Sequence, residues 1–285
     1  MSKTNAVVSL AVAGFTISWA SILIIWSGMN PIAVSFWRTA LASLALTPLM
    51  IKDLRGQGLN IPLKLLALGG LALAIHFMTW ITSLYYTTVA MSVTIVSTYS
   101  VFTIPITLAI GRRVSGLTVI GASLALIGVA VMMYSSYGLN TGNLLGDALA
   151  LAGSASGAFY FIIGELSRVK APTSVYSTLV YALAALFTAP VALIMGINLT
   201  PPSVKSLVMI ALIVAGPMLM GHTLLNYSLK YLPATVVSTV TLIEPAGSTI
   251  LAYMLLHQPV NLIEAASMVV TLIGVYLSIR GGLMP

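Results

Sequence analysis

Arg38 and Glu244 are the residues best placed to do chemistry, because each stands in the middle of a long apolar run. In a bilayer such a charge costs about 2.5 to 3.5 kcal/mol on insertion scales and is usually inward-facing, paired or functional. At 1.5 Å per residue the two lie about 10 Å and about 18 Å from the outer ends of their runs, both well inside the membrane, so they can meet. Two roles follow from the sequence, a structural ion pair or a substrate site that holds both charges of a zwitterion.

Glu244 is also the candidate for proton coupling, since it is the single acid at the middle of an apolar run. Polar and aromatic residues at similar depth, or on runs that can face the same space, are the further substrate-binding candidates: His76, Trp80, Tyr99, Trp19, Tyr160 and Asn226. His222 is a weaker candidate. The histidines and aromatic residues equally suit packing or an interfacial belt, and this alternative stays open.

Composition places these residues in a membrane. The 285 residues are 59% hydrophobic and 6% charged, with a mean hydropathy of +1.07, whereas a soluble domain is roughly one quarter charged. A span needs about 20 mostly apolar residues. The chain divides into ten such runs, at residues 5–26, 31–51, 62–84, 88–110, 115–134, 143–167, 172–195, 203–229, 233–256 and 261–280. The expected fold class is therefore all-α integral membrane, with no soluble domain.

Internal similarity divides the ten runs into two units, 1–138 and 139–285. Corresponding features include Ala11, Gly14 and Ser18 with Ala150, Gly153 and Gly157, residues 96–100 with 241–245, and Ile127-Gly128-Val129 with Ile273-Gly274-Val275. Five helices per unit is an odd number, so the second unit is inverted relative to the first. Inverted repeats are typical of secondary transporters, whose sites lie near the membrane midplane.

Basic residues test the orientation independently. With a cytoplasmic N-terminus, the inner side carries Lys3, Lys52, Arg55, Lys64, Arg112, Arg113, Arg168, Lys170, Lys230 and Arg280, and the outer side carries Lys205. Ten against one agrees with the positive-inside rule. The net charge of +7 therefore reflects membrane orientation, and nucleic acid is not an expected partner.

The prolines, the small residues and the remaining charged residues each lead to a local prediction. Pro105, Pro217 and Pro245 fall inside runs and predict bends or breaks, because each removes a helical N–H. The small residues Gly146, Ala150, Gly153, Gly157 and Gly164 favour close helix packing. Glu165 and Arg168 are interpreted as an exposed pair one helical turn apart, and Asp53, Asp147 and Glu264 as surface charges.

Several motifs together resemble the EamA-type members of the drug/metabolite transporter superfamily. They are Phe36-Trp37-Arg38-Thr39-Ala40-Leu41-Ala42, Asn226-Tyr227-Ser228-Leu229-Lys230, Leu242-Ile243-Glu244-Pro245 and the two Ile-Gly-Val endings. The resemblance covers the whole chain and implies ten helices in two halves and the transport of small metabolites. His257-Gln258 stands where the family often has a Gly-Glu pair.

The predicted function is secondary transport of amino acids or similar zwitterionic or neutral solutes by alternating access, with export as the expected direction. Carriers of phosphate esters, nucleosides or amines remain alternatives. An intramembrane enzyme ranks below them, since the sequence has no cysteine, no paired mid-span carboxylates and no metal-ligand spacing. We expect no cofactor or metal, and we expect a small-molecule substrate, the lipid bilayer and protons as candidate partners. The expected oligomeric state is a monomer or a homodimer. The expected location is the cell membrane, as a multi-pass protein with both termini cytoplasmic.

Overall fold

A computed structural model describes residues 3–55, 61–137, 143–168, 171–256 and 262–283, and all its regular elements are helices. The first half contains α1 (Lys3–Ile17), α2 (Ala20–Ser27), α3 (Pro31–Leu54), α4 (Leu63–Ser83), α5 (Val89–Val96), α6 (Tyr99–Ala109) and α7 (Gly116–Tyr137). The second half contains α8 (Leu144–Arg168), α9 (Thr173–Ile194), α10 (Val204–Ile213), the π-helix η1 (Val214–His222), α11 (Thr223–Ser228), α12 (Ala234–Val240), α13 (Ile243–Leu256) and α14 (Leu262–Leu283). The predicted turn at residues 257–261 lies outside the described residues.

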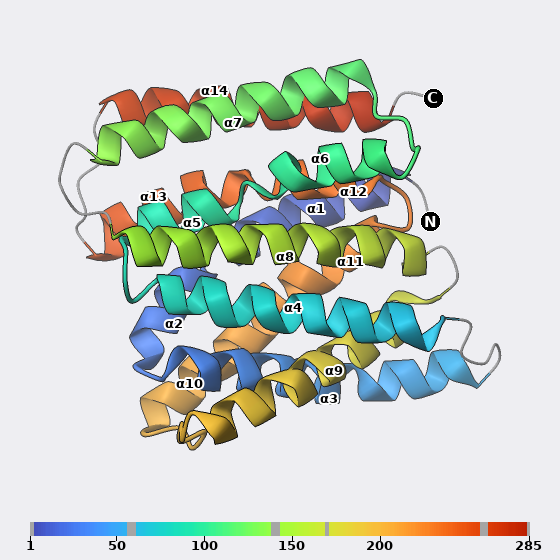
Figure 1. Ribbon diagram of the computed structural model, residues 1–285, viewed down its shortest axis with the longest axis vertical. Helices are drawn as coiled ribbons and strands as arrows, with labels where there is room; N and C mark the ends of the chain where they lie inside the picture. Colours follow the sequence, from blue (N-terminus) through green and yellow to red (C-terminus); the bar gives the residue numbers. More distant parts are fainter. Residues whose placement is uncertain (1–2, 56–60, 138–142, 169–170, 257–261, 284–285) are drawn as a thin grey trace.

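These helices form the predicted spans. Within the described ranges, nine helical stretches are long and apolar enough to cross a membrane, and α7 adds a shorter apolar stretch, Gly116–Val131. The ends of the spans agree with the sequence prediction to within about one helical turn. Figure 1 shows the helices side by side, with both chain termini at the same edge of the bundle. The prediction of an all-α integral membrane protein with ten spans is confirmed.

Several helices begin where the sequence supplies a capping group. The Asn30 side chain accepts a hydrogen bond from the Ile32 N–H (2.9 Å) just before α3, and Thr88 accepts one from the Met91 N–H (3.2 Å) before α5. Such side chains satisfy N–H groups that have no partner within the helix. Pro31 occupies the first position of α3, where its missing N–H costs nothing.

Three of the spans are interrupted in the middle. The interruptions fall at residues 18–19, between α1 and α2, at 97–98, between α5 and α6, and at 241–242, between α12 and α13. At each one a hydroxyl donates to a carbonyl of the preceding turn: Ser18 to Gly14 (2.8 Å), Thr98 to Ile95 (2.7 Å) and Thr241 to Ser238 (2.7 Å). These bonds compete with the regular helical pattern and help to explain where the helices stop.

The proline predictions meet different outcomes. Pro245 lies in the first turn of α13, directly after an interruption, and Pro217 lies inside the π-helix, so both mark departures from α-helical geometry as predicted. At Pro105 the sequence predicted a bend or a break, and the structure has no break there. Helix α6 continues through Pro105, and its span is interrupted earlier, at the hydroxyl residues Ser97 and Thr98.

The interrupted spans lie against one another. Helix α5 packs on α13, and α6 packs on α12. The hydroxyls of Thr103 and Ser238 are 2.8 Å apart and join α6 to α12, while Ser248 of α13 donates to the Ser18 carbonyl at 3.0 Å. The three interruptions are thereby held together in the bundle interior.

The small residues of α8 pack as predicted. A methyl group at Gly153 would meet Trp80 and Thr79 of α4 at 3.1 to 3.2 Å. One at Gly157 would collide with the Tyr99 ring and lie 3.1 Å from the His76 ring. Close approach of α8 to α4 and α6 therefore sets the positions of two predicted site residues.

Candidate functional site

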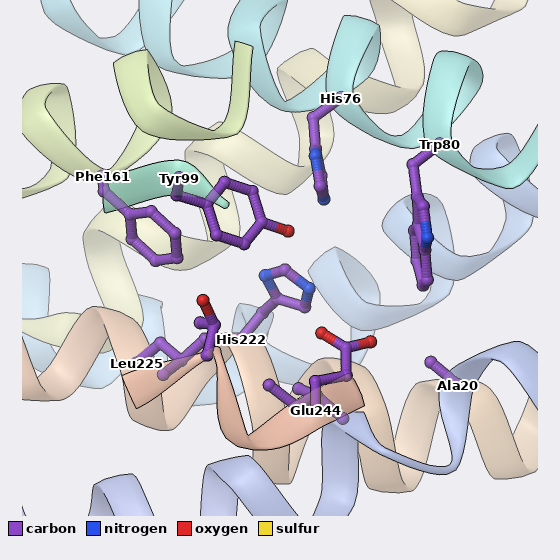
Figure 2. Close-up of a pocket in the computed structure, with 10 residues that line it drawn as sticks. Ala20, His76, Trp80, Tyr99, Phe161, His222, Leu225 and Glu244 are labelled. Carbon is purple, nitrogen blue, oxygen red and sulfur yellow. The ribbon is translucent and has the colours of Figure 1, made fainter. Parts of the chain in front are cut away.

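A narrow cavity of about 10 Å³ lies at the level of the helix interruptions, which is room for about one water molecule. Its lining comes from eight helices and one interruption (Figure 2): Ile17, Ala20, His76, Trp80, Tyr99, Phe161, His222, Leu225, Thr241 and Glu244. Ile17 and Ala20 flank the first interruption, Tyr99 begins the helix after the second, Thr241 lies in the third, and Glu244 follows the third in the first turn of α13. Regular helices give way to irregular backbone around a shared space, which is the construction of many transporter sites.

Glu244 brings a carboxylate to this cavity. It lies in the first turn of α13, where the positive end of the helix dipole favours an anion. The residue is 5% exposed, its carboxylate points into the cavity in Figure 2, and it makes no hydrogen bond or ion pair with any described residue. It is therefore available to a ligand or a proton.

His76 is fixed in one orientation. Its Nδ1 lies 2.8 Å from the Gly153 carbonyl oxygen, and because a carbonyl only accepts, Nδ1 must carry the proton. In the neutral ring Nε2 is then an acceptor. The ring stacks on Trp80, with centroids 5.9 Å apart and planes 12° from parallel. A hydrogen bond and a stacked ring thus hold His76 in place.

His222 lies beside His76, with ring centroids 6.2 Å apart. Its Nδ1 is buried without a hydrogen-bond partner among the described residues. The ring stands edge-on to Phe77 at 5.0 Å. His222 is the last residue of the π-helix, and π-helical turns are often found at functional sites. Its place in the cavity lining makes it a stronger binding candidate than the sequence indicated. Pro217 was the sequence feature that could have indicated the departure from α-helical geometry.

Arg38 lies behind the cavity wall. The residue is 0% exposed, and its guanidinium carbon is 3.9 Å from the centroid of Phe77 and 5.8 Å from that of Trp80. All three of its nitrogen atoms are buried without a hydrogen-bond partner in the described chain. Arg38 and Glu244 interact electrostatically but do not form a direct ion pair. The structural pair considered from the sequence is absent from this conformation, and Phe77 is a neighbour that the sequence analysis missed.

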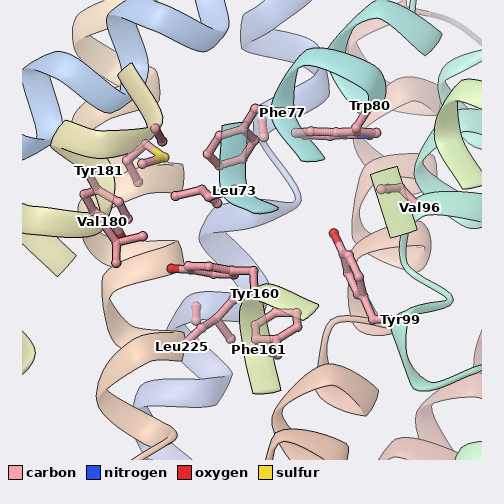
Figure 3. Close-up of a cluster of buried hydrophobic side chains, with 14 of the residues drawn as sticks. Leu73, Phe77, Trp80, Val96, Tyr99, Tyr160, Phe161, Val180, Tyr181 and Leu225 are labelled. Atoms are coloured by element: carbon pink, nitrogen blue, oxygen red, sulfur yellow. The ribbon is translucent and has the colours of Figure 1, made fainter. Parts of the chain in front are cut away.

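Aromatic side chains form most of the remaining wall. Tyr99 directs its hydroxyl towards the cavity (Figure 2) and packs edge-on against Phe161 at 5.3 Å. The Trp80 indole N–H is buried without a partner among the described residues. Figure 3 shows Phe77, Trp80, Tyr99, Tyr160 and Phe161 surrounding the same interior region. Phe161 was not predicted, because an apolar residue on an apolar helix carries no distinguishing sequence signal.

Tyr160 and Asn226 belong to an adjacent polar network and are not part of the cavity lining. The Tyr160 hydroxyl donates to Asn226 Oδ1 at 2.8 Å, and the Asn226 amide donates to Ser177 at 3.0 Å. Tyr181 and Thr223 extend the network, with hydroxyls 3.1 Å apart. Tyr160 still borders the site, since its ring is 6.4 Å from that of His222.

Trp19 is placed elsewhere. It is half-buried and lines an apolar groove together with residues of α2, α10 and η1. Its neighbour Ala20 lines the cavity instead. Of the eight predicted binding residues, the cavity lining therefore includes His76, Trp80, Tyr99 and Glu244.

Glu165 and Arg168 do not form the exposed pair that their spacing suggested. Glu165 pairs with Arg112 at 2.7 Å and accepts a hydrogen bond from the Ala234 N–H at 3.0 Å. Arg168 is 1% exposed and donates to the carbonyls of Asn226 and Ala171 and to the Thr173 hydroxyl. Arg112, Ala234 and Asn226 belong to distant segments, and the spacing of Glu165 and Arg168 within one helix cannot reveal such partners. Asp53 also has a partner, since it accepts a hydrogen bond from Ser174.

Metal binding has no visible basis in the described ranges, where no three His, Asp or Glu side chains gather closely enough to hold an ion. The chemistry available to the cavity is that of one free carboxylate, imidazole nitrogens, a phenol, an indole N–H and aromatic faces.

The fold and this interior site define a multi-pass helical membrane protein of the transporter class. A solved crystal structure that is 16% identical shares the fold, with a TM-score of 0.76 over 96% of each chain. The chain belongs to the EamA-like transporter family, which matches residues 3–134 and 144–280. It is 24% identical to an uncharacterized transporter of Clostridium kluyveri, over 86% of this chain and 82% of the relative, and 24% identical to another from Archaeoglobus fulgidus, over 97% of both.

Proposed function

We propose that this EamA-family transporter exports amino acids or closely similar zwitterions. The observation that carries the proposal is a pair of opposite buried charges, Arg38 and Glu244, each without a hydrogen-bond partner among the described residues. A buried unsatisfied charge is costly, so it is retained where a ligand satisfies it. A zwitterion can satisfy both in one binding event.

The two charged groups have different access to the cavity. Glu244 faces it directly and can accept an ammonium group, which the surrounding rings also favour through cation–π attraction. Arg38 lies behind Phe77 and Trp80, with a guanidinium fork suited to a carboxylate. Binding of the carboxylate therefore requires Phe77 or Trp80 to move, and the narrow cavity has to widen.

A panel of three ligands tests this assignment on the purified full-length protein. It consists of an amino acid, the amine that lacks its carboxylate, and the acid that lacks its amino group, each measured by ligand-induced thermal shift. The amino acid should stabilise the protein most. Arg38→Lys, which keeps the charge but loses the fork, should weaken amino-acid binding and leave amine binding unchanged.

Lys64→Gln provides a matched control, because it removes an exposed cation far from the cavity. Equal stabilisation by the amine and the amino acid would reject the role of Arg38 and favour amine transport. Amines are the second candidate class of substrate, because the cavity lining itself contains a carboxylate and aromatic rings but not Arg38.

Proton coupling is assigned to Glu244 within this proposal. In proteoliposomes, Glu244→Gln should abolish transport driven by a pH gradient and preserve exchange of substrate for substrate, because exchange does not require proton release. Gradient-driven transport at the normal rate in this variant would exclude Glu244 as the proton carrier.

Alternating access between two inverted repeats, 1–138 and 139–285, is the proposed mechanism. The family match in two segments supports this division, as do the interruptions at 97–98 and 241–242, in the fourth and ninth spans. The proposed location is the cell membrane with both termini cytoplasmic, on the basis of the basic-residue asymmetry.

Labelling of single cysteines tests the orientation directly, because the natural chain has no cysteine. Ser115→Cys should react with an impermeant thiol reagent only from the cytoplasmic side, and Asn198→Cys only from outside. Reaction of both cysteines from the same side would contradict the proposed orientation.

A further inference from the structure

An apolar groove runs along the outside of the bundle between the first and eighth spans. Its walls include Trp19, Leu23 and Trp26 on one side and Met209, Leu212 and Met220 on the other, and its volume is about 370 Å³. Helix α2 packs on α10, and α1 packs on η1, so the groove follows the boundary between two spans. Its walls are apolar, and because they belong to two spans we expect the groove to open towards the hydrocarbon region of the membrane.

A cation stands at one end of this groove. Lys205, Met209, Leu212 and Gly216 follow one another at helical spacings of four, three and four residues, so they share one face of α10 and its continuation. Lys205 lies about 6 Å beyond Met209 along the helix axis, at 1.5 Å per residue. It is exposed and forms no ion pair with any residue that the structure describes. In Figure 1 this end of α10 lies opposite the chain termini.

Trp26 adds an amphipathic ring near the Lys205 end of the groove. It lies in the last turn of α2, near the same end as Lys205, and is half-buried. Tryptophan prefers the boundary between headgroups and acyl chains. The groove thus has a cation and an amphipathic ring at its end and an apolar body, the order of groups found in a phospholipid.

We propose that this groove is a specific site for one phospholipid with an anionic headgroup. An acyl chain lies between Trp19 and Leu212, and the headgroup phosphate contacts the Lys205 ammonium. A second apolar groove, between α7 and α14, has a similar volume, about 410 Å³. In the sequence no lysine or arginine lies within one turn of its lining residues, and Glu264 adjoins Ile263. Charge therefore distinguishes a headgroup site from an ordinary lipid-facing surface.

The position of the site connects it to the cavity. Ala215, Gly216 and Pro217 line the groove and belong to η1, the same π-helix that ends at the cavity residue His222. An acyl chain in the groove consequently packs on the segment that carries His222. The binding proposal itself is independent of the transported substrate.

Fluorescence quenching by brominated lipids tests the proposal, because Trp19 and Trp26 line the groove. The full chain is reconstituted in phosphatidylcholine with increasing fractions of brominated phosphatidylglycerol, and in a second series with brominated phosphatidylcholine. One lysine near the surface favours an anionic lipid by about 1 kcal/mol, so quenching should show a roughly fivefold preference for phosphatidylglycerol. Trp19→Phe should remove much of the selective component.

Variants separate the headgroup contact from the acyl-chain contact. Lys205→Gln should abolish the preference and Lys205→Arg should keep it, while Lys64→Gln controls for loss of a distant cation. Ala215→Phe fills the groove and should reduce selective quenching, whereas Ala266→Phe fills the groove between α7 and α14 and should not. Equal quenching by the two lipids, or an unchanged preference in Lys205→Gln, would show bulk lipid contact only and overturn the proposal.

Discussion

Arg38 and Arg168 are both arginines buried within apolar spans, at 0% and 1% exposure, yet their surroundings are opposite. Arg168 donates through all three nitrogen atoms, to the Asn226 and Ala171 carbonyls and to Thr173. Arg38 has no hydrogen-bond acceptor among the described residues, and its guanidinium lies over the rings of Phe77 and Trp80. Burial alone therefore does not reveal what a charge does.

The two acids Glu165 and Glu244 repeat the contrast. Glu165 has both an ion pair and a backbone N–H partner, whereas Glu244 has neither. The satisfied charges, Glu165 and Arg168, lie on one helix near its end, and the unsatisfied ones lie around the central cavity. Satisfied charges stabilise the fold, and unsatisfied ones keep their hydrogen-bonding capacity for a ligand.

The largest expected effect is the loss of Arg168. Arg168→Met leaves two buried carbonyls and the Thr173 hydroxyl without their donor, so the free energy of unfolding should fall by about 3 kcal/mol. Thermal or denaturant unfolding in detergent measures this. Wild-type stability in the variant would contradict the structural role assigned to Arg168.

Arg38→Met should have a different outcome, with an effect on binding instead of on the fold. Because no hydrogen bond is lost and a buried charge is removed, the free energy of unfolding should stay the same or rise by about 1 kcal/mol. Amino-acid affinity should fall at least about tenfold, equivalent to roughly 1.4 kcal/mol. Destabilisation as large as that of Arg168→Met would erase the distinction between the two arginines.

A smaller loss of stability is expected at Glu165. Its partner Arg112 is 41% exposed, so solvent and salt screen the pair, and Glu165→Gln should lower stability by only about 0.5 to 1 kcal/mol. The difference from wild type should shrink at high ionic strength. Glu244→Gln, compared in the same assay, should cost no stability; a loss at Glu244 larger than that at Glu165 would count against a free carboxylate in the cavity.

Much of the fold was predictable because span length and hydropathy are properties of contiguous residues. The ten spans follow from runs of about 20 apolar residues, and Glu244 and Tyr99 could be chosen as site residues from their depth. The partners of Glu165 could not be predicted in the same way. Arg112 precedes it by 53 residues, and only the packed bundle brings the two together.

The interruptions show the same limit. Proline correctly marked the departures at Pro217 and Pro245, but the break at residues 97–98 has no proline and depends on hydroxyl groups that compete for helix carbonyls. Serine and threonine are frequent throughout this sequence, so their presence does not single out a break. His222 was underestimated for a related reason, since the π-helix that presents it is a tertiary outcome.

The π-helix also has a consequence for how this sequence can change over evolutionary time. Its i to i+5 bonds accommodate one more residue per closed ring than α-helical bonds do. Deletion of one codon within Val214–His222 can therefore be absorbed by conversion to α-helix, with the flanking helices kept in their present orientation. The same deletion in the regular helix α8 would rotate everything beyond it by about 100°. The eighth span is thus a position where a related gene can gain or lose a residue without refolding the bundle, at the cost of moving His222.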